Sequence, residues 1–372
     1  MRKAAYILFW IVFFFLINCG IPSCDFGHDS KFTNVGLITA NQENLPSTTI
    51  SPTLNEPILP GRNVLWCGTF QLAWNEACAL IGEDLHLDAD PPMVADLNRR
   101  QFTRGELDEE SYVALAGFVG DGIFAKIPLA LLQKFKGQAT PHCLPDPKRT
   151  PRPQDFVTYA YLFKKLEFDR PFEQIDRKMA FDGGPTQVPV FGLGEYKSDH
   201  QKLYGQVHIL DYRGDDDFVI ELLTKARKDR LILAKFPPEK TLEATVRQVQ
   251  KRITQANAID MQTGDVLAVP KFNFDLTREY RELYQRLSVK NPKVAADIQI
   301  LSAIQDIRFQ MDEKGVRLRS ESHISFGCGA GNPMPRHILI FNKPFLVMMQ
   351  RTEAKTPYFA LWVGNADLLA KQ

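Results

Sequence analysis

The sequence has few cysteines and no grouping of residues typical of a metal site. Its six cysteines form no C-x-x-C pair, and the four beyond residue 24 lie far apart along a chain of 372 residues. Zinc sites use closely spaced thiolates or imidazoles, and disulfide scaffolds use a larger share of cysteine. We therefore expect no metal and no cofactor. One or two disulfides among the four distal cysteines remain open.

An excess of one charge is also missing. The chain carries 45 Lys and Arg against 44 Asp and Glu, a formal net charge of +1. Proteins that bind nucleic acid or an anionic membrane through their overall field are strongly basic. The balance of charge gives no reason to expect either partner, and we expect no nucleic acid ligand.

Long apolar runs are absent except at the start. Arg2 and Lys3 precede fourteen apolar residues from Ala4 to Ile17. This run is shorter than the roughly twenty residues of a comfortable membrane span and matches a secretory signal. We predict an export or lipoprotein signal over residues 1–24, which leaves the protein secreted, periplasmic or anchored to a membrane. Cys19 and Cys24 are candidate lipidation positions, and an ordinary signal or an uncleaved anchor remains open.

Residues 25–60 are rich in Ser, Thr, Asn and Pro and have almost no apolar periodicity. Such composition is typical of a flexible tether. The folded domain is predicted to span residues 61–370, and we expect a monomer.

Helices are predicted first and strands afterwards. A short strand over 63–67 precedes apolar spacings of three and four residues, which indicate helices over 69–81, 92–97, 108–118 and 127–135. From residue 156 the pattern favours strands over 157–163, 179–191, 206–212, 218–223, 231–236, 266–274, 304–311, 338–350 and 358–363. Helices are expected only at 241–253 and 277–287 in this half. This order predicts an α+β fold with large mixed or antiparallel sheets.

One stretch organises the second half of the chain. From Val316 to Phe326 apolar or hydroxyl residues alternate with charged ones, which is a strand pattern. The Gly/Pro-rich run 327–335 follows and excludes regular structure. The sequence therefore predicts an exposed loop with a strand-competent stem.

Five motifs resemble those of the serpins, and they follow one another along the chain in the order usual for that family. They are Phe168-Asp-Arg-Pro-Phe172 with Val188-Pro-Val190; Val269-Pro-Lys-Phe272; Asp312-Glu-Lys-Gly315; Phe341-Asn-Lys-Pro-Phe345 with Thr356–Gly364; and Asn63–Cys67. The resemblance covers about residues 156–369 and is thin before that, where one or more helices are trimmed. Phe168 stands where the family typically has tryptophan.

The resemblance implies a reactive-centre loop. In serpins a protease cuts this loop, and the loop then inserts as a strand of the main sheet. The hinge and stem would here be Glu313, Gly315, Val316, Leu318, Ser320 and Ser322. The candidate bait positions are Gly329, Pro333 and Arg336.

The stem sequence decides between two functional hypotheses. Its inward face carries no charge, so insertion buries no ion. Its Val and Leu replace the small residues of inhibitory members, however, and an exposed stem would leave large apolar side chains in water. We therefore predict a non-inhibitory or weakly inhibitory binding protein. The alternative is a serine or cysteine endopeptidase inhibitor that acts on an extracellular or periplasmic protease.

Four other parts of the sequence suggest chemistry, and each also has a structural explanation. Cys67 lies at a strand-to-helix turn, where a cysteine hydrolase would place a nucleophile, with His142, His208, His323 or His337 as its base. A buried cysteine explains the position better, and no enzymatic activity is expected. Residues 327–331 lack the helix that a phosphate loop needs. An acidic turn at 215–217 and a solvated basic run at 225–230 explain those charges without calcium or a polyanion.

Overall fold

The computed structural model describes residues 36–137, 139, 141, 144, 152–194, 201–255, 257–291, 294, 298–316 and 337–371. Within these ranges the α-helices are α1 (Thr69–Ile81), α2 (Pro92–Asn98), α3 (Ile123–Phe135), α4 (Gln201–Tyr204) and α5 (Leu242–Thr254). Short 3-10 helices occupy Gln42–Asn44, Arg104–Glu106, Glu109–Ser111, Val119–Asp121 and Arg281–Leu283. Among these described residues no helix combines the length and apolar character that a membrane crossing requires.

The largest sheet has eight strands in the order β12-β9-β10-β11-β18-β19-β3-β2. Their bounds are β2 (Thr48–Ser51), β3 (Asn63–Cys67), β9 (Val207–Gly214), β10 (Asp217–Leu222), β11 (Asp229–Lys235), β12 (Ile259–Asp260), β18 (Phe345–Arg351) and β19 (Phe359–Val363). Strands β3, β18 and β19 are buried along almost their whole length. Burial on both faces explains their continuous apolar sequences. This sheet forms the centre of the largest hydrophobic core.

Four smaller sheets surround it. One has four strands in the order β17-β13-β8-β7, and another has three in the order β1-β14-β15. Two pairs, β4-β5 and β16-β6, complete the set. The bounds are β1 (Ile38–Asn41), β4 (Tyr112–Phe118), β5 (Phe156–Leu162), β6 (Leu166–Glu167), β7 (Glu173–Ala180), β8 (Gln187–Leu193), β13 (Val266–Pro270), β14 (Phe272–Glu279), β15 (Ile304–Met311), β16 (Gly315–Val316) and β17 (Ile338–Ile340).

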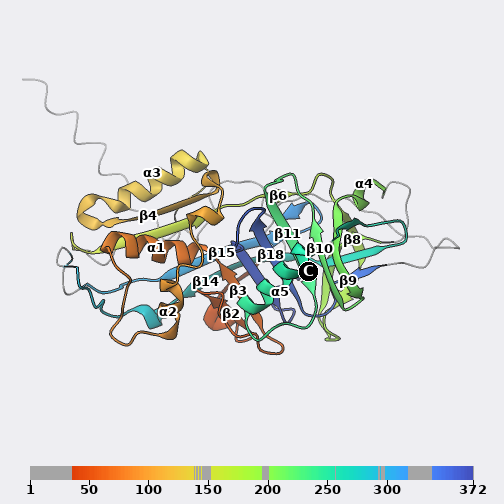
Figure 1. Ribbon diagram of the computed structural model, residues 1–372, viewed down its shortest axis with the longest axis horizontal. Helices are drawn as coiled ribbons and strands as arrows, with labels where there is room; N and C mark the ends of the chain where they lie inside the picture. The colour runs from red at the N-terminus through yellow and green to blue at the C-terminus, as the bar shows by residue number, and fades with distance from the viewer. Residues whose placement is uncertain are drawn as a thin grey trace, which may run out of the picture.

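The helices cover these sheets in layers. In Figure 1, α3 lies on the outside above β4. Helix α1 lies beneath the β4-β5 pair, and α5 lies in front of the large sheet. Helix α5 begins at Thr241, whose Oγ1 accepts a hydrogen bond from the Ala244 N–H at 3.2 Å. Helix α1 ends at Gly82, which has a φ of 86° and donates its N–H to the Cys78 carbonyl. Both termini are the capping arrangements that the sequence favours.

The predicted helix over 108–118 is wrong. Residues 112–118 form strand β4, which pairs antiparallel with β5 from Tyr112 opposite Leu162 to Phe118 opposite Phe156. The apolar spacing of three that suggested a helix equally fits a short strand preceded by a single 3-10 turn. Seven consecutive cross-strand pairs decide the conformation here.

The predicted helix over 277–287 is also wrong, and the strand over 266–274 is divided. Strand β14 continues to Glu279 because it pairs with β15 along its full length. Between β13 and β14, Lys271 marks the point where the chain passes from the four-stranded sheet to the three-stranded sheet.

The predicted tether over 25–60 is wrong where the structure describes it. Strand β1 pairs in parallel with β14, and β2 pairs in parallel with β3. Ile50 and Leu54 are buried in the main core. The folded part therefore begins before residue 61, and partners distant in sequence order this polar segment.

Two strands lead toward the candidate loop. Among the described strands, β5 pairs with β4 and β15 pairs with β14. The candidate loop begins at the end of β15.

Candidate functional site: the base of the loop

The chain reverses immediately after β15. We call Asp312–Gly315 the hinge turn. The Asp312 N–H donates to the Gly315 carbonyl at 3.0 Å, and the Gly315 N–H donates back to the Asp312 carbonyl at 3.2 Å. The Asp312 carboxylate accepts a hydrogen bond from the Lys314 N–H at 2.9 Å. This side-chain contact is the usual way in which aspartate stabilises a turn.

Gly315 occupies a place where no other residue fits. Its φ is 132°, and a Cβ there would lie 2.2 Å from the Leu166 carbonyl oxygen. Gly315 pairs with Asp312 on one side and with Glu167 of β6 on the other. The turn therefore packs closely against the backbone of β6 at this point, an approach that glycine allows.

Val316 continues the pairing. It lies opposite Leu166 in the antiparallel β16-β6 pair, and only 5% of it is exposed. The beginning of the stem thus already forms sheet structure in this state. The rest of the predicted stem lies outside the described residues, so the expectation that the stem rests in a sheet stays a prediction.

An ion pair holds the hinge turn to the neighbouring sheet. The Lys271 Nζ lies 2.6 Å from Glu313 Oε2, and the two side chains are 14% and 10% exposed. Lys271 stands between β13 and β14, so this contact joins the loop base to two sheets. A pair buried to this extent resists separation because removing one partner strands the other charge.

Two backbone hydrogen bonds and two aromatic rings add to this hold. The Phe168 N–H donates to the Lys314 carbonyl at 2.9 Å, and the Phe172 N–H donates to the Glu313 carbonyl at 2.7 Å. The two rings are buried and meet edge to face with centroids 4.7 Å apart. Phe168 therefore adds a buried aromatic contact beside the hinge turn.

The hinge turn also contains a carboxyl group in an unfavourable environment. Burial raises the pKa of Asp312, and the neighbouring Glu313 adds to the shift, while the Lys314 backbone N–H opposes it. The charged form of Asp312 is thus stabilised less than it would be in water.

The other end of the loop is tied down as well. Strand β17 pairs in parallel with β13. Just before it, the His337 N–H and the His337 Nδ1 both lie 3.0 Å from Asp265 Oδ1. The Asp265 side chain is fully buried and also accepts the Gln262 N–H at 2.8 Å. This carboxylate fixes the position at which the chain returns from the loop.

Lys235 anchors the next turn of chain. Its Nζ donates to the Ile340 carbonyl at 2.8 Å and to Asn342 Oδ1 at 3.0 Å, and it lies 2.8 Å from Asp216 Oδ1. The side chain is only 3% exposed. Burial lowers the pKa of Lys235, and its contact with Asp216 counteracts that shift. Buried cations of this kind require several acceptors.

The structure brings some of the predicted site residues together and does not describe others. Glu313, Gly315 and Val316 form the hinge turn and β16. The other predicted stem, bait and lipidation positions lie outside the described residues: Leu318, Ser320, Ser322, Gly329, Pro333, Arg336, Cys19 and Cys24.

Cys67 does not have the surroundings of a nucleophile. It is buried, and burial raises the pKa of its thiol although Thr69 and Gly68 donate hydrogen bonds that oppose the shift. A reactive cysteine needs a lowered pKa. Of the candidate bases, His208 lies 3.3 Å from Asp260 and His337 contacts Asp265. His142 and His323 lie outside the described residues. Cys67 and Cys78 are both free thiols.

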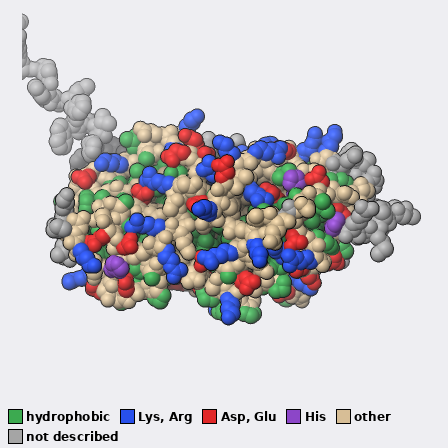
Figure 2. Space-filling view, viewed as in Figure 1, with side chains coloured by type: hydrophobic (Ala, Val, Ile, Leu, Met, Phe, Trp, Pro, Cys, Tyr) green, Lys and Arg blue, Asp and Glu red, His purple; other side chains and the backbone are tan. Residues whose placement is uncertain are grey.

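The remaining charged motifs have structural partners. In the acidic turn, Asp215 accepts the Tyr212 hydroxyl at 2.5 Å, Asp216 pairs with Lys235 and Lys343, and Asp217 pairs with Arg252. Within the described ranges no three His, Cys, Asp or Glu side chains are grouped as a metal ion would require. Figure 2 shows both signs of charge interspersed over the visible face.

The basic run is likewise neutralised by ion pairs. Lys225 pairs with Glu167, Arg227 with Asp169, and Arg230 with Glu221. These contacts leave little net positive field for a polyanion.

Sequence reasoning missed the residues that fix both ends of the loop. Lys271, Asp265 and Lys235 each lie in or beside an apolar strand, and each ends up buried or nearly so. A charged residue within an apolar strand is itself a signal, since a buried charge needs a partner. The identity of that partner depends on the tertiary structure.

Comparison with known proteins finds likeness in structure only. No protein-family model and no curated protein sequence matches the chain. Among solved structures, the chain is similar to thyroxine-binding globulin in complex with thyroxine, with 14% identity, a TM-score of 0.47, and coverage of 82% of this chain and 93% of that one. It is also similar to a highly specific serpin of the insect Tenebrio molitor, with 14% identity, a TM-score of 0.45, and coverage of 82% and 92%. These likenesses concern the fold alone. The expected α+β class is confirmed by the structure itself, which has few helices and large mixed sheets.

Proposed function

We propose that the protein is an exported, serpin-like binding protein that presents residues 317–336 to a partner and does not trap proteases efficiently. The observation that carries this proposal is the state of the stem. Gly315 and Val316 are buried and paired with β6. A stem that already rests in a sheet has less free energy to gain from further insertion.

The fixed ends of the loop support the same function. Glu313 and Lys271 hold one end, and Asp265 and Lys235 hold the other. Fixed ends hold the loop at one place on the molecule, so a partner that binds it meets the same neighbouring surface each time. The partner is proposed to be an exported protein, with an extracellular or periplasmic protease as the first class to test.

A second candidate is an endopeptidase inhibitor that acts by loop insertion. The specific observation in its favour is that β16, at the start of the loop, already pairs antiparallel with β6, so this part of the chain can form sheet structure. A loop that inserted further as a strand would gain ladder hydrogen bonds and bury one face.

Incubation with a panel of secreted serine and cysteine proteases separates the two candidates. The samples are denatured and run on SDS gels. The proposed function predicts a cleaved chain of reduced size and no covalent complex. A band at the summed mass of the protein and the protease would contradict the proposed function and support the inhibitor instead.

A matched pair of variants locates the recognition. Arg336→Ala removes a basic bait position near the end of the loop, whereas Arg227→Ala removes a basic residue that pairs with Asp169 at the surface. If a trypsin-like protease is the partner, only Arg336→Ala slows loop cleavage. Equal rates for both variants would show that Arg336 is not read.

A further inference from the structure

Helix α3 is apolar on its outward face as well as on its inward one. Of its thirteen residues only Lys126, Gln133 and Lys134 are polar. Ile127 and Leu131 face inward and are buried against β4 and β5. A helix that is apolar all round is normally enclosed by protein or by lipid.

The outward face of α3 is exposed. Leu129 and Leu132 are 51% and 56% exposed, and Ala125 and Pro128 beside them are exposed too. Spacings of three and four residues place all four on one side of the helix. Of the four large apolar side chains that stand out as exposed among the described residues, two are these adjacent leucines. Figure 1 shows α3 as an outer layer, so no described element covers this face.

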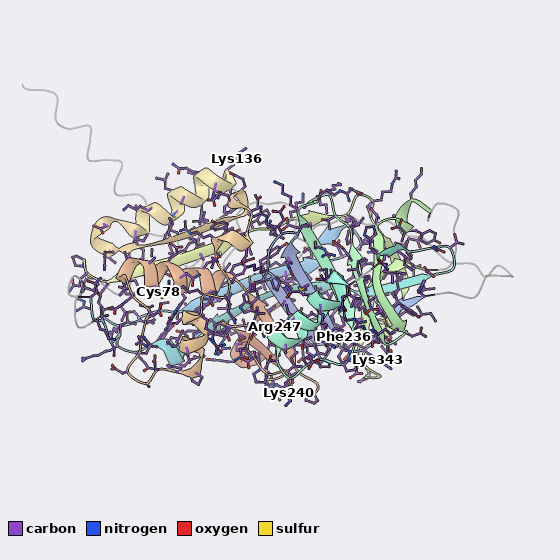
Figure 3. All side chains as sticks on the ribbon, in the orientation of Figure 1. Cys78, Lys136, Phe236, Lys240, Arg247 and Lys343 are labelled. Carbon is purple, nitrogen blue, oxygen red and sulfur yellow. The ribbon has the colours of Figure 1, made fainter. Side chains whose placement is uncertain are left out.

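The charges carried by the helix itself have one sign. No acidic residue occurs from Ile123 to Gly137, although Asp121 is exposed just before the helix. Lys134 donates to the Glu109 carbonyl at 2.7 Å and pairs with the Glu109 carboxylate at 3.3 Å, while Lys126 and Lys136 are exposed beside the apolar face. Figure 3 labels Lys136 at the outer edge of the molecule, at the end of α3. An apolar face bordered by lysines is typical of a helix that lies in a membrane interface.

We propose that α3 docks on a lipid bilayer through Ala125, Pro128, Leu129 and Leu132, with Lys126 and Lys136 at the headgroups. The near-neutral charge of the whole chain does not oppose this, because the field that matters is that of the helix. The leucines enter the acyl boundary, and the lysine stems reach the phosphates.

The length of chain before the described residues supports a bilayer as the occupant. This step rests on the expectation that residues 1–24 anchor the protein. Between Ile17 and Gly36 lie 18 residues, 18 to 35. Fully extended, they reach about 60 Å. A domain of this size has a radius of gyration of about 20 Å. An anchored chain can therefore lay α3 on the membrane that holds it.

Photolabelling tests the proposal locally. The full-length chain is placed in phosphatidylcholine vesicles, with and without phosphatidylglycerol, that contain a diazirine phospholipid. Labelled peptides are then identified by mass spectrometry. We expect labelling over 123–137 to exceed that of peptides containing Leu59 or Ile259, whose exposure is similar, by about tenfold.

Two double variants distinguish the apolar contacts of α3 with the bilayer from its ionic contacts. The double variant Leu129→Gln with Leu132→Gln should lose the α3 labelling in both kinds of vesicle, with its melting temperature unchanged because the positions are exposed. Lys126→Gln with Lys136→Gln should lose it mainly in vesicles with phosphatidylglycerol.

Other outcomes overturn the proposal in recognisable ways. Labelling confined to residues 1–24 would keep the anchor and remove α3 from the bilayer. Equal labelling of α3 and the two control peptides would show that contact is non-specific. Dimers that form in the absence of lipid and disappear in the leucine double variant would show that the face binds a second copy instead.

Discussion

At the scale of single residues, the Lys271–Glu313 pair makes the strongest contribution to the loop base. Lys271→Met removes the close cation of the buried Glu313 carboxylate and leaves it only the more distant Lys314 Nζ, 3.9 Å from Oε1, so we expect the free energy of unfolding to fall by about 3 kcal/mol. Urea denaturation measures this change. The control is Arg281→Met, since the Arg281–Glu279 side chains are 65% and 36% exposed and such pairs contribute less than about 1 kcal/mol. Equal losses in the two variants would contradict a special role for Lys271.

Gly315 provides a second test at this scale. In Gly315→Ala the Cβ meets the Leu166 carbonyl at 2.2 Å, so we expect a loss of about 3 kcal/mol or more. Gly61→Ala is the matched control: its φ is also positive, at 69°, but nothing lies within 4 Å. Backbone strain alone should cost that variant about 1–2 kcal/mol. A Gly315→Ala protein as stable as Gly61→Ala would show that the enclosure by β6 is not maintained in solution.

Asp312 makes stability depend on pH. Because its pKa is raised in the folded state, the fold binds this proton more tightly than the unfolded chain does. Its contribution is complete below about pH 4, the ordinary value, and is lost as the pH rises through the raised pKa. Asp312→Asn keeps an acceptor for the Lys314 N–H and removes the charge. We expect it to be more stable than the native chain at pH 7 and to lose this advantage in acid.

The control for Asp312 has the opposite sign. Hydrogen bonds from Lys235 and Lys343 lower the pKa of Asp216. Asp216→Asn should therefore be less stable than the native chain at pH 7, with the difference disappearing as the pH falls below the ordinary value. Denaturation curves measured from pH 3 to pH 7 compare the two variants. Parallel curves for native and Asp312→Asn chains would refute the assignment.

At the scale of elements, β16 keeps the stem in place. Val316→Asp puts a carboxylate at a position that is 5% exposed, so β16 should separate from β6. We expect proteolysis within residues 317–336 to become about tenfold faster or more. Leu59→Asp, at an exposed position, should leave the rate unchanged. Limited proteolysis with mass spectrometry gives both rates, and an unchanged rate for Val316→Asp would mean that β16 does not protect the loop.

The elements also show how far local sequence reaches. Helices α1 and α5 were predictable because their periodicity and their caps, Gly82 and Thr241, are local features. Strand β4 and the end of β14 were not, because pairing with β5 and β15 overrides a helical spacing. Strands β1 and β2 were missed for the same reason. The partner of β1 is distant in the sequence, and β2 has a polar sequence, so neither strand leaves a local pattern.

For the site, the sequence identified one of the two residues in each contact. The motif Asp312–Gly315 was readable, and so was the uncharged inward face of the stem. The partners Lys271, Leu166 and Asp265 were not, since these side chains meet the loop only through the arrangement of three sheets. Long-range pairing of this kind leaves no local pattern.

At the scale of the whole molecule, the central claim is that the base of the loop, Gly315 and Val316, already occupies its final position beside β6. Cutting the loop should then release little free energy. A mechanism that traps proteases by loop insertion requires the reverse, because the cut loop would then add a complete strand to a sheet.

The melting temperature before and after a single cut within residues 317–336 tests this claim most directly. The cut is confirmed by mass spectrometry, and both forms are heated under identical conditions. We expect a change of less than about 3 °C, which corresponds to about 2 kcal/mol for a chain of this size. A rise of about 20 °C or more would show that the loop inserts after cleavage and would contradict the account.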